Sequence, residues 1–185
     1  MNYLLPNDID IYYLNEQIKF INRTIKLENL SYSEMEDKLD KKNLDYFLGY
    51  PAIYPVSLEE TYISSTFGPR TDPYTQKKQH HKGDDFAGRS GVTVVATADG
   101  IVKNSKRYGT FGNFVEIDHG NGYVTKYAHL RNRSVKKGEK VSRGQKIGTI
   151  GNTGRSTAPH LHYEVLYKGK NQDPHNFYFI PNLDS

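Results

Sequence analysis

The first 48 residues carry an apolar stripe with a helical period. Ile11, Leu14, Ile18, Ile21 and Ile25 step by three and four residues, as the buried face of an α-helix does. The same spacing is the a/d pattern of a coiled coil, and about two heptads do not separate a packed helix from a coiled-coil remnant.

A second helix is predicted from Ser33, where Glu36 completes a capping box three positions later. Its apolar positions are Met35, Leu39, Leu44 and Phe47. We therefore assign residues 1–50 to a helical N-terminal segment. Its role is open among a packed spacer or coiled-coil remnant, an inhibitory lid over a groove, and a homo- or hetero-oligomerisation element.

After residue 50 the pattern changes to short strands separated by turns. TVVATADGIVKN predicts a strand, an Asp-Gly turn at 99–100 and a strand. NFVEIDHGNGYVTKYAHL repeats this arrangement around residues 120–122, and HLHYEVLY, residues 160–167, predicts a final strand. Closely spaced strands of this kind predict a mainly β fold, an antiparallel β sandwich-like domain, over residues 51–185.

The amino-acid composition limits the residue types that can bind a metal and the classes of partner. Cysteine is absent, so a metal site must use His, Asp and Glu. The net charge is +4 but no long basic run occurs, which indicates solubilising lysines rather than a nucleic-acid partner. No apolar run of about 18 residues is present, so we expect no transmembrane helix, and neither an export signal nor a membrane anchor is visible.

The candidate chemistry lies in the seven histidines. In HHKGDDFAG, a histidine twice precedes an aspartate by four residues, as His80 with Asp84 and His81 with Asp85. Positions an even number apart share a face of an extended segment, so either pair can bind one ion. The alternative for each pair is a surface histidine in a weak ion pair.

His160 and His162 share one face of the predicted strand by the same rule. Two imidazoles and one carboxylate with an open fourth position make a hydrolytic zinc site, in which the metal activates water. His129, in YAHL, supplies a further imidazole for a proton or an oxyanion.

Five segments, in order and spacing, carry a family resemblance. They are STFGPR, HHKGDDFAGRSGVTVVATADGIV, YGTFGNFVEIDHGNGYVTKYAHL, VKKGEKVSRGQKIGTIGNTGRSTAPHLHYEV and DPHNF. From about Tyr62 to Phe179 the chain resembles the LytM/lysostaphin-type zinc metalloendopeptidases, which cut the peptides of bacterial peptidoglycan. The N-terminal segment lies outside the resemblance.

The resemblance implies a ligand set for one Zn²⁺ per chain. The family pattern H-x-G-x-D maps onto His81 and Asp85 and excludes His80, and the second histidine of H-x-H maps onto His162 as the third ligand. Asp84 departs from the pattern, because the family usually has an apolar residue there. It either faces solvent or acts on the neighbouring ligands.

The resemblance also implies two catalytic imidazoles. The first histidine of H-x-H maps onto His160 as the general base or acid. The lone family histidine maps onto His129, which either orients the water or stabilises the tetrahedral intermediate. Ser156 and Thr157 precede this motif and line the groove or form a simple turn.

The implied function is a zinc-dependent metalloendopeptidase acting on peptidoglycan cross-links, with D-Ala–diamino acid bonds expected. Glycine bridges and carboxypeptidase trimming of stems are the other substrates considered. Such a substrate places the protein in the periplasm or cell envelope. Two rivals are a non-catalytic LytM-like module that binds cell wall or activates another hydrolase, and a biotinyl/lipoyl-type carrier domain, which leaves the histidines unexplained.

Overall fold

The computed structural model describes residues 48–72 and 75–178, all within one compact unit that spans residues 45–185. The two predicted N-terminal helices lie outside the described residues, so they stay predictions. Among the residues described, none of the helices has the length and apolar character needed to cross a membrane.

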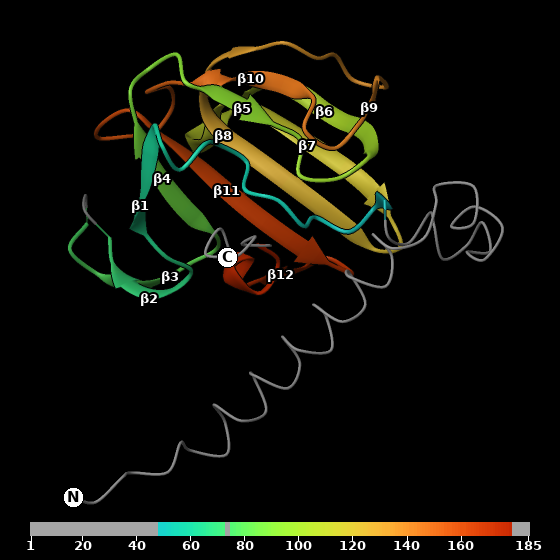
Figure 1. The fold of residues 1–185 in the computed structure, drawn as a ribbon. Helices are drawn as coiled ribbons and strands as arrows, with labels where there is room; N and C mark the ends of the chain where they lie inside the picture. The colour runs from blue at the N-terminus through green and yellow to red at the C-terminus, as the bar shows by residue number, and fades with distance from the viewer. Residues whose placement is uncertain (1–47, 73–74, 179–185) are drawn as a thin grey trace, which may run out of the picture. The chain divides into compact units, whose positions relative to one another are not determined.

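The described part is built from strands (Figure 1). They are β1 (Thr61–Ser65), β2 (Gly68–Thr71), β3 (Lys78–His81), β4 (Asp84–Gly88), β5 (Thr93–Val95), β6 (Gly100–Tyr108), β7 (Gly112–Gly120), β8 (Tyr123–Arg133), β9 (Lys140–Val141), β10 (Lys146–Ile150), β11 (His160–Tyr167) and β12 (Lys170–Gln172). Two short 3-10 helices, η1 (Gly109–Phe111) and η2 (Pro174–Asn176), follow β6 and β12. All the pairings between these strands are antiparallel, which confirms the mainly β, antiparallel prediction.

The main sheet has the order β1-β4-β11-β8-β7-β6-β9. Strand β8 lies in the middle of this order and pairs with two different strands along one of its edges. Residues 123–128 pair with β11, and residues 130–133 pair with β10, which also pairs with β5. Strands β2 and β3 form a separate hairpin beside β4 (Figure 1).

Strand β11 separates the apolar core from the site. Leu161, Tyr163 and Val165 are fully buried in the single apolar cluster, as side chains on one face of a strand should be. The intervening His162 and Glu164 are also buried but point to the opposite face. Each large core side chain contributes about 1.5–3 kcal/mol of transfer free energy, so the core fixes the face that carries the histidines.

The turn predictions had mixed outcomes. The β7–β8 hairpin is confirmed: Asn121 and Gly122 have φ values of 51° and 88°, as a two-residue turn of type I′ requires. The hairpin implied by the Asp-Gly turn at 99–100 is wrong, because β5 pairs with β10 whereas β6 pairs with β7 and β9. Gly100 instead permits close packing, since a Cβ there would lie 2.6 Å from the Asp118 carbonyl oxygen.

The predicted strand over residues 160–167 is confirmed as β11, but it is not the final strand, since β12 follows it.

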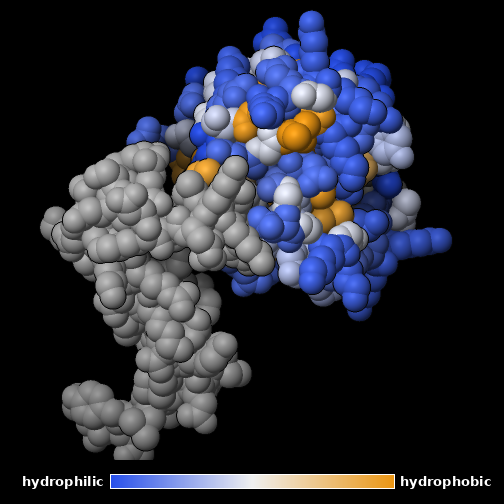
Figure 2. Space-filling view, turned by 90° about the vertical axis from the view of Figure 1, so that its right-hand side faces the viewer, coloured by the Kyte–Doolittle hydropathy of each residue, from blue (hydrophilic) through white to orange (hydrophobic). Residues whose placement is uncertain are grey.

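The face shown in Figure 2 is mainly hydrophilic, with small separate hydrophobic spots. Within residues 48–72 and 75–178, the large apolar side chains that are exposed are Leu58, Tyr62, Ile101 and Tyr108. Isolated residues of this kind are ordinary on a protein surface, so they mark no docking face.

Candidate functional site

Three ligand-type side chains converge at the junction of β3, β4 and β11. The His162 Nδ1 atom lies 2.8 Å from Asp85 Oδ1 and 3.1 Å from His81 Nε2, and the last two atoms are 3.3 Å apart. The sheet register explains the meeting, because His162 is directly opposite Asp85 across the β4–β11 pairing. All three side chains are buried.

Gly83 explains the spacing between the first two residues. A Cβ at this position would lie 2.0 Å from the Tyr163 carbonyl oxygen, closer than atoms can approach. Only glycine therefore allows the chain between His81 and Asp85 to pass against β11, the strand that carries His162. The glycine of the H-x-G-x-D pattern is thus a packing requirement.

The residues fit a zinc ion. Tetrahedral zinc with bonds of about 2.0–2.2 Å separates its ligand atoms by roughly 3.3–3.6 Å. The three observed separations, 2.8, 3.1 and 3.3 Å, lie at the lower end of that range or a few tenths of an ångström below it. Two imidazole nitrogens with one carboxylate oxygen also form a donor set typical of catalytic zinc, which leaves a fourth position for water or substrate.

Arg70 holds the second oxygen of the Asp85 carboxylate. Its Nη1 atom donates to Asp85 Oδ2 at 2.8 Å and to Ser65 Oγ at 2.6 Å. Asp85 therefore presents Oδ1 alone to the two histidines. Burial opposes ionisation of Asp85, but hydrogen bonds and charge from His162 and His81 hold the pKa of its carboxyl well below the ordinary value.

His162 lies between two carboxylates. Its Nδ1 faces Asp85, and its Nε2 lies 3.2 Å from Glu164 Oε1. Burial lowers the pKa of an imidazole, but here hydrogen bonds and charge from Asp85 and Glu164 outweigh burial and raise the pKa of His162 to about 9. The surroundings thus favour positive charge at this point, as a cation-binding site requires.

His129 sits where β8 changes partner. Ala128 is the last residue of β8 paired with β11, and Leu130 is the first paired with β10. His129 between them has a φ of 60°, within a register shift opposite β7. Such irregularities re-aim side chains near functional sites, and this one turns His129 toward His162, with ring centroids 6.0 Å apart.

The free nitrogen of His129 is fixed by its other nitrogen. Nδ1 donates to the Thr153 carbonyl at 2.8 Å, so Nε2 carries the lone pair. Burial, with the positive charge of nearby histidines, lowers the pKa of His129 to about 4, so the ring is neutral at pH 7. Thr153 itself is anchored by hydrogen bonds to the Leu130 carbonyl and the Asn113 amide.

His160 has the same arrangement. Its Nδ1 donates to the Ala158 carbonyl at 2.8 Å, and the Ser156 hydroxyl lies 3.1 Å from the same nitrogen. Its Nε2 is 3.8 Å from Asp85 Oδ1, at the edge of the ligand cluster. Two imidazoles whose Nδ1 atoms face backbone carbonyls therefore lie beside the three ligand-type residues.

The remaining histidines lie elsewhere. His80 is exposed and packs edge-on against Phe67, with ring centroids 4.6 Å apart. His119 is buried, and its two ring nitrogens form hydrogen bonds with the Asp99 carbonyl and the Thr125 hydroxyl. His175 contacts Asp84 at 3.1 Å.

Asp84 is not solvent-facing, because its side chain is fully buried. Oδ1 accepts from the Phe67 amide at 2.9 Å, while Oδ2 accepts from the Tyr178 hydroxyl at 2.9 Å and lies 3.1 Å from His175 Nδ1. Asp84, Asp173 and His175 also form a group with metal-ligand spacing. Because protein donors already satisfy both Asp84 oxygens, we read this group as a structural anchor for the segment after β12.

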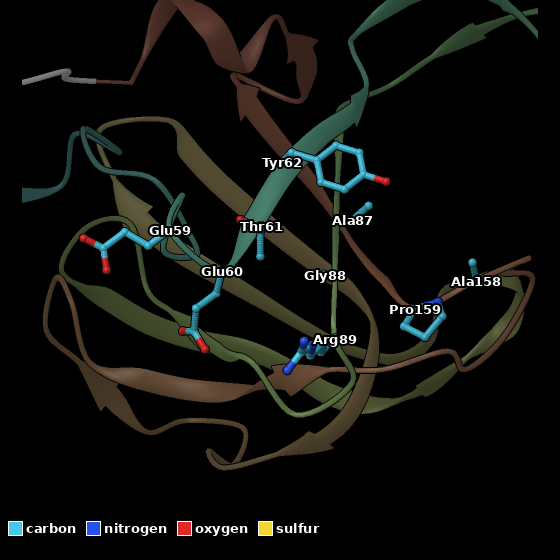
Figure 3. A pocket seen from close by; sticks show the side chains of 9 residues that line it. All are labelled: Glu59, Glu60, Thr61, Tyr62, Ala87, Gly88, Arg89, Ala158 and Pro159. Atoms are coloured by element: carbon cyan, nitrogen blue, oxygen red, sulfur yellow. The ribbon is translucent and has the colours of Figure 1, made fainter.

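The five residues lie in an open groove of about 630 Å³. Among the residues that line it, Arg155 donates to the Asp72 carboxylate at 2.7 Å. The groove continues into a second hollow of about 520 Å³ beside β1 and β4 (Figure 3). Tyr62 and Pro159 line both hollows, so the two adjoin each other.

Sequence reasoning missed three residues that support the site. Glu164 follows the two histidines of HLHYEV at alternate positions, so the period of the strand was the signal for it. Arg70 lies in the quoted STFGPR segment, but its distance in sequence from Asp85 gave no local signal. Thr153 acts through a backbone carbonyl, which leaves no trace in residue type.

Comparison with known proteins gives the family. Peptidase family M23 matches residues 79–174. The peptidoglycan DD-endopeptidase ShyA of Vibrio cholerae is 42% identical over 156 residues, which are 84% of this chain and 36% of ShyA. This chain therefore belongs to peptidase family M23, and it spans about a third of the length of that relative.

Solved structures agree with this assignment. A zinc-containing peptidase from Vibrio cholerae aligns with a TM-score of 0.61 and 44% identity, covering 65% of this chain and 37% of that one. A chain of the SpoIIQ–SpoIIIAH pore-forming complex aligns with a TM-score of 0.64 and 28% identity, covering 72% of this chain and 94% of that one.

Proposed function

We propose that this protein is a zinc-dependent endopeptidase that hydrolyses peptide cross-links of bacterial peptidoglycan, with D-Ala–diamino acid bonds as the expected substrate. The single observation that carries the proposal is the convergence of His81, Asp85 and His162 beside the Nε2 atoms of His129 and His160. Family membership and the similarity to ShyA support the same activity.

In this proposal His81 Nε2, Asp85 Oδ1 and His162 Nδ1 hold one zinc ion. When bound, zinc supplies Lewis-acid activation of water and of a carbonyl oxygen. His81 is already arranged for this role, because its Nδ1 donates to the Thr66 carbonyl at 2.9 Å and leaves the Nε2 lone pair toward the other two residues.

The two other imidazoles divide the proton work. His160 Nε2 is placed to take a proton from the attacking water and to return it to the leaving amine. His129 is neutral, and its Nε2 accepts hydrogen bonds but has no proton to donate. We therefore assign His129 to orienting the water rather than to stabilising an oxyanion.

The substrate places the protein in the cell envelope, and the periplasm is the compartment we propose. Residues 51–185 form the peptidase domain in this account, with residues 1–50 as a spacer or coiled-coil remnant. Glycine bridges and single stems trimmed by carboxypeptidase action are the other substrates considered.

The test is digestion of purified muropeptide dimers joined by D-Ala–diamino acid bonds, followed by mass spectrometry. Zinc-loaded protein should convert dimers into monomers, and chelator treatment or the variant His160→Ala should leave them intact. Dimers that survive the zinc-loaded protein would refute this substrate; parallel incubations with glycine-bridged dimers and with single pentapeptide stems identify the other two.

A second candidate is a non-catalytic module that binds another protein. The observation that favours it is the structural similarity to a chain of the SpoIIQ–SpoIIIAH complex. The complete ligand set favours the peptidase instead. A protein that binds zinc, cuts neither dimers nor stems, and raises the activity of another hydrolase would favour the module.

A further inference from the structure

Glu164 is a buried carboxylate that takes no part in the proposed reaction itself. Only 1% of the surface of this residue is exposed to solvent. Burying an unpaired carboxylate is strongly unfavourable, so such a group is retained only with good partners. Glu164 has three: Oε1 lies 3.2 Å from His162 Nε2, while Oε2 accepts from Lys126 Nζ at 3.1 Å and from Asn171 Nδ2 at 3.0 Å.

These partners come from three neighbouring strands, so the sheet itself builds the cluster. Glu164 and His162 lie two residues apart on β11 and share a face. Lys126 is the residue of β8 directly opposite Glu164, and Asn171 comes from β12, the edge partner of β11. Asn171 also donates to the Lys82 carbonyl, in the turn between two of the ligands.

The position of Glu164 determines which nitrogen of His162 carries the proton. An ionised carboxylate only accepts hydrogen bonds, so the contact at 3.2 Å requires a proton on Nε2. A neutral imidazole with this proton has its lone pair on Nδ1. That nitrogen is the one within 3.1 Å of both His81 Nε2 and Asp85 Oδ1.

We propose that Glu164, held by Lys126, is the positioning residue of the metal centre: it fixes the tautomer and the ring orientation of His162 so that Nδ1 faces the metal. This inference rests on the proposed zinc site. The two histidine ligands then differ in their supporting acceptor, a neutral carbonyl for His81 and a charged carboxylate for His162. Outer carboxylates of this kind raise the basicity of a ligating imidazole.

The first test is the zinc dissociation constant of Glu164→Gln, measured by competition with a chromophoric chelator. The amide keeps the volume of the side chain and removes its charge. We expect zinc affinity to fall by about 10–100-fold. The matched control is Glu116→Gln. Glu116 lies opposite Lys126 on β7, but its carboxylate accepts a hydrogen bond from Asn104 rather than from His162. This variant should therefore bind zinc as tightly as the wild type does.

A second variant separates positioning from folding. Lys126→Met with Glu164→Leu removes both charges together, and replacing a buried ion pair by apolar side chains of similar volume is often neutral or stabilising. With chelator present, this double variant should unfold thermally at or near the wild-type temperature. Its zinc affinity should still fall by at least tenfold, because His162 Nε2 has lost its acceptor.

The outcomes are distinct. If the wild type binds zinc and both Glu164 variants bind it equally tightly, the inference is wrong while the proposed function stands. A loss of the same size in Glu116→Gln also overturns it, because the effect would then not be specific to His162. If the wild type binds no zinc, the proposed function itself fails.

Discussion

His129 and His160 place their imidazole ring centroids 4.7 Å apart, and each donates its Nδ1 proton to a backbone carbonyl. The two rings come from different strands, β8 and β11, and both lie near the ligand cluster: the His129 ring centroid is 6.0 Å from that of His162, and His160 Nε2 is 3.8 Å from Asp85 Oδ1. In the proposed mechanism these two imidazoles handle protons while the other three residues bind the metal, and that division of roles is testable.

His160→Ala should keep zinc and lose turnover. His160 Nε2 lies outside the group of three ligand atoms, so the metal site survives, while loss of the general base typically costs about 100-fold or more. Zinc content and kcat measured on the same preparation check this. A His160→Ala protein without zinc would instead make His160 a ligand.

Gly112→Ala should slow the enzyme through Thr153. A Cβ at Gly112 would lie 2.4 Å from the Thr153 carbonyl oxygen, the atom that holds His129. We expect at least a tenfold loss of kcat with full zinc content, by comparison with the cost of misplaced catalytic groups. Gly109→Ala is the control, because Gly109 also has a positive φ but open space around it. Equal losses in the two variants would assign the effect to backbone strain alone.

Tyr178→Phe should destabilise the fold and spare the metal. The Tyr178 hydroxyl donates to the buried carboxylate of Asp84, and hydrogen bonds to charged groups are worth roughly 1.5–3 kcal/mol. The free energy of unfolding in denaturant should fall by about that amount, with unchanged zinc content. Tyr54, whose ring stacks on Tyr178 at 4.2 Å, provides the control Tyr54→Phe, expected within about 0.5 kcal/mol of wild type. If the two variants were equally stable, Asp84 would not be the anchor we describe.

Protonation of His119 should lower the free energy of unfolding in mild acid. Burial lowers the pKa of His119 to about 4, against about 6.5 in the unfolded chain, although the Asp99 carbonyl and the charges of Asp99 and Asp118 oppose the shift. Between these values the unfolded state binds more protons, so stability falls as pH drops from 6.5 to 4, by up to about 3 kcal/mol. In chelator-treated protein, His119→Asn should lose less stability than wild type over this range. Parallel pH profiles for the two proteins would contradict the account.

Local signals predicted the parts of the fold that local chemistry decides. The Asn121-Gly122 turn was predictable because a type I′ turn needs positive φ at both positions. The Asp-Gly pair at 99–100 misled, because strand pairing is decided by distant residues, and Gly100 is needed for contact with β7. Turn chemistry alone cannot distinguish these two uses of glycine.

The site was predictable for a related reason. His81, Asp85, His160 and His162 lie in two short segments whose internal spacing limits their geometry, and His129 was noted as a further imidazole. Spacing left the pair His80 and Asp84 open as well, and the family resemblance selected His81 with Asp85. The supporting residues were not predictable in the same way. Glu164 was visible only as a residue that shares the face of His162, and the Thr153 carbonyl only in three dimensions.

The most direct measurement is the zinc content of purified wild-type protein by elemental analysis, beside His162→Ala and His160→Ala. The account predicts about one zinc per chain in wild type and in His160→Ala, and none in His162→Ala. Wild-type protein that binds no zinc after reconstitution, or a His162→Ala variant that keeps it, would contradict the assignment of His81, Asp85 and His162 as the metal site.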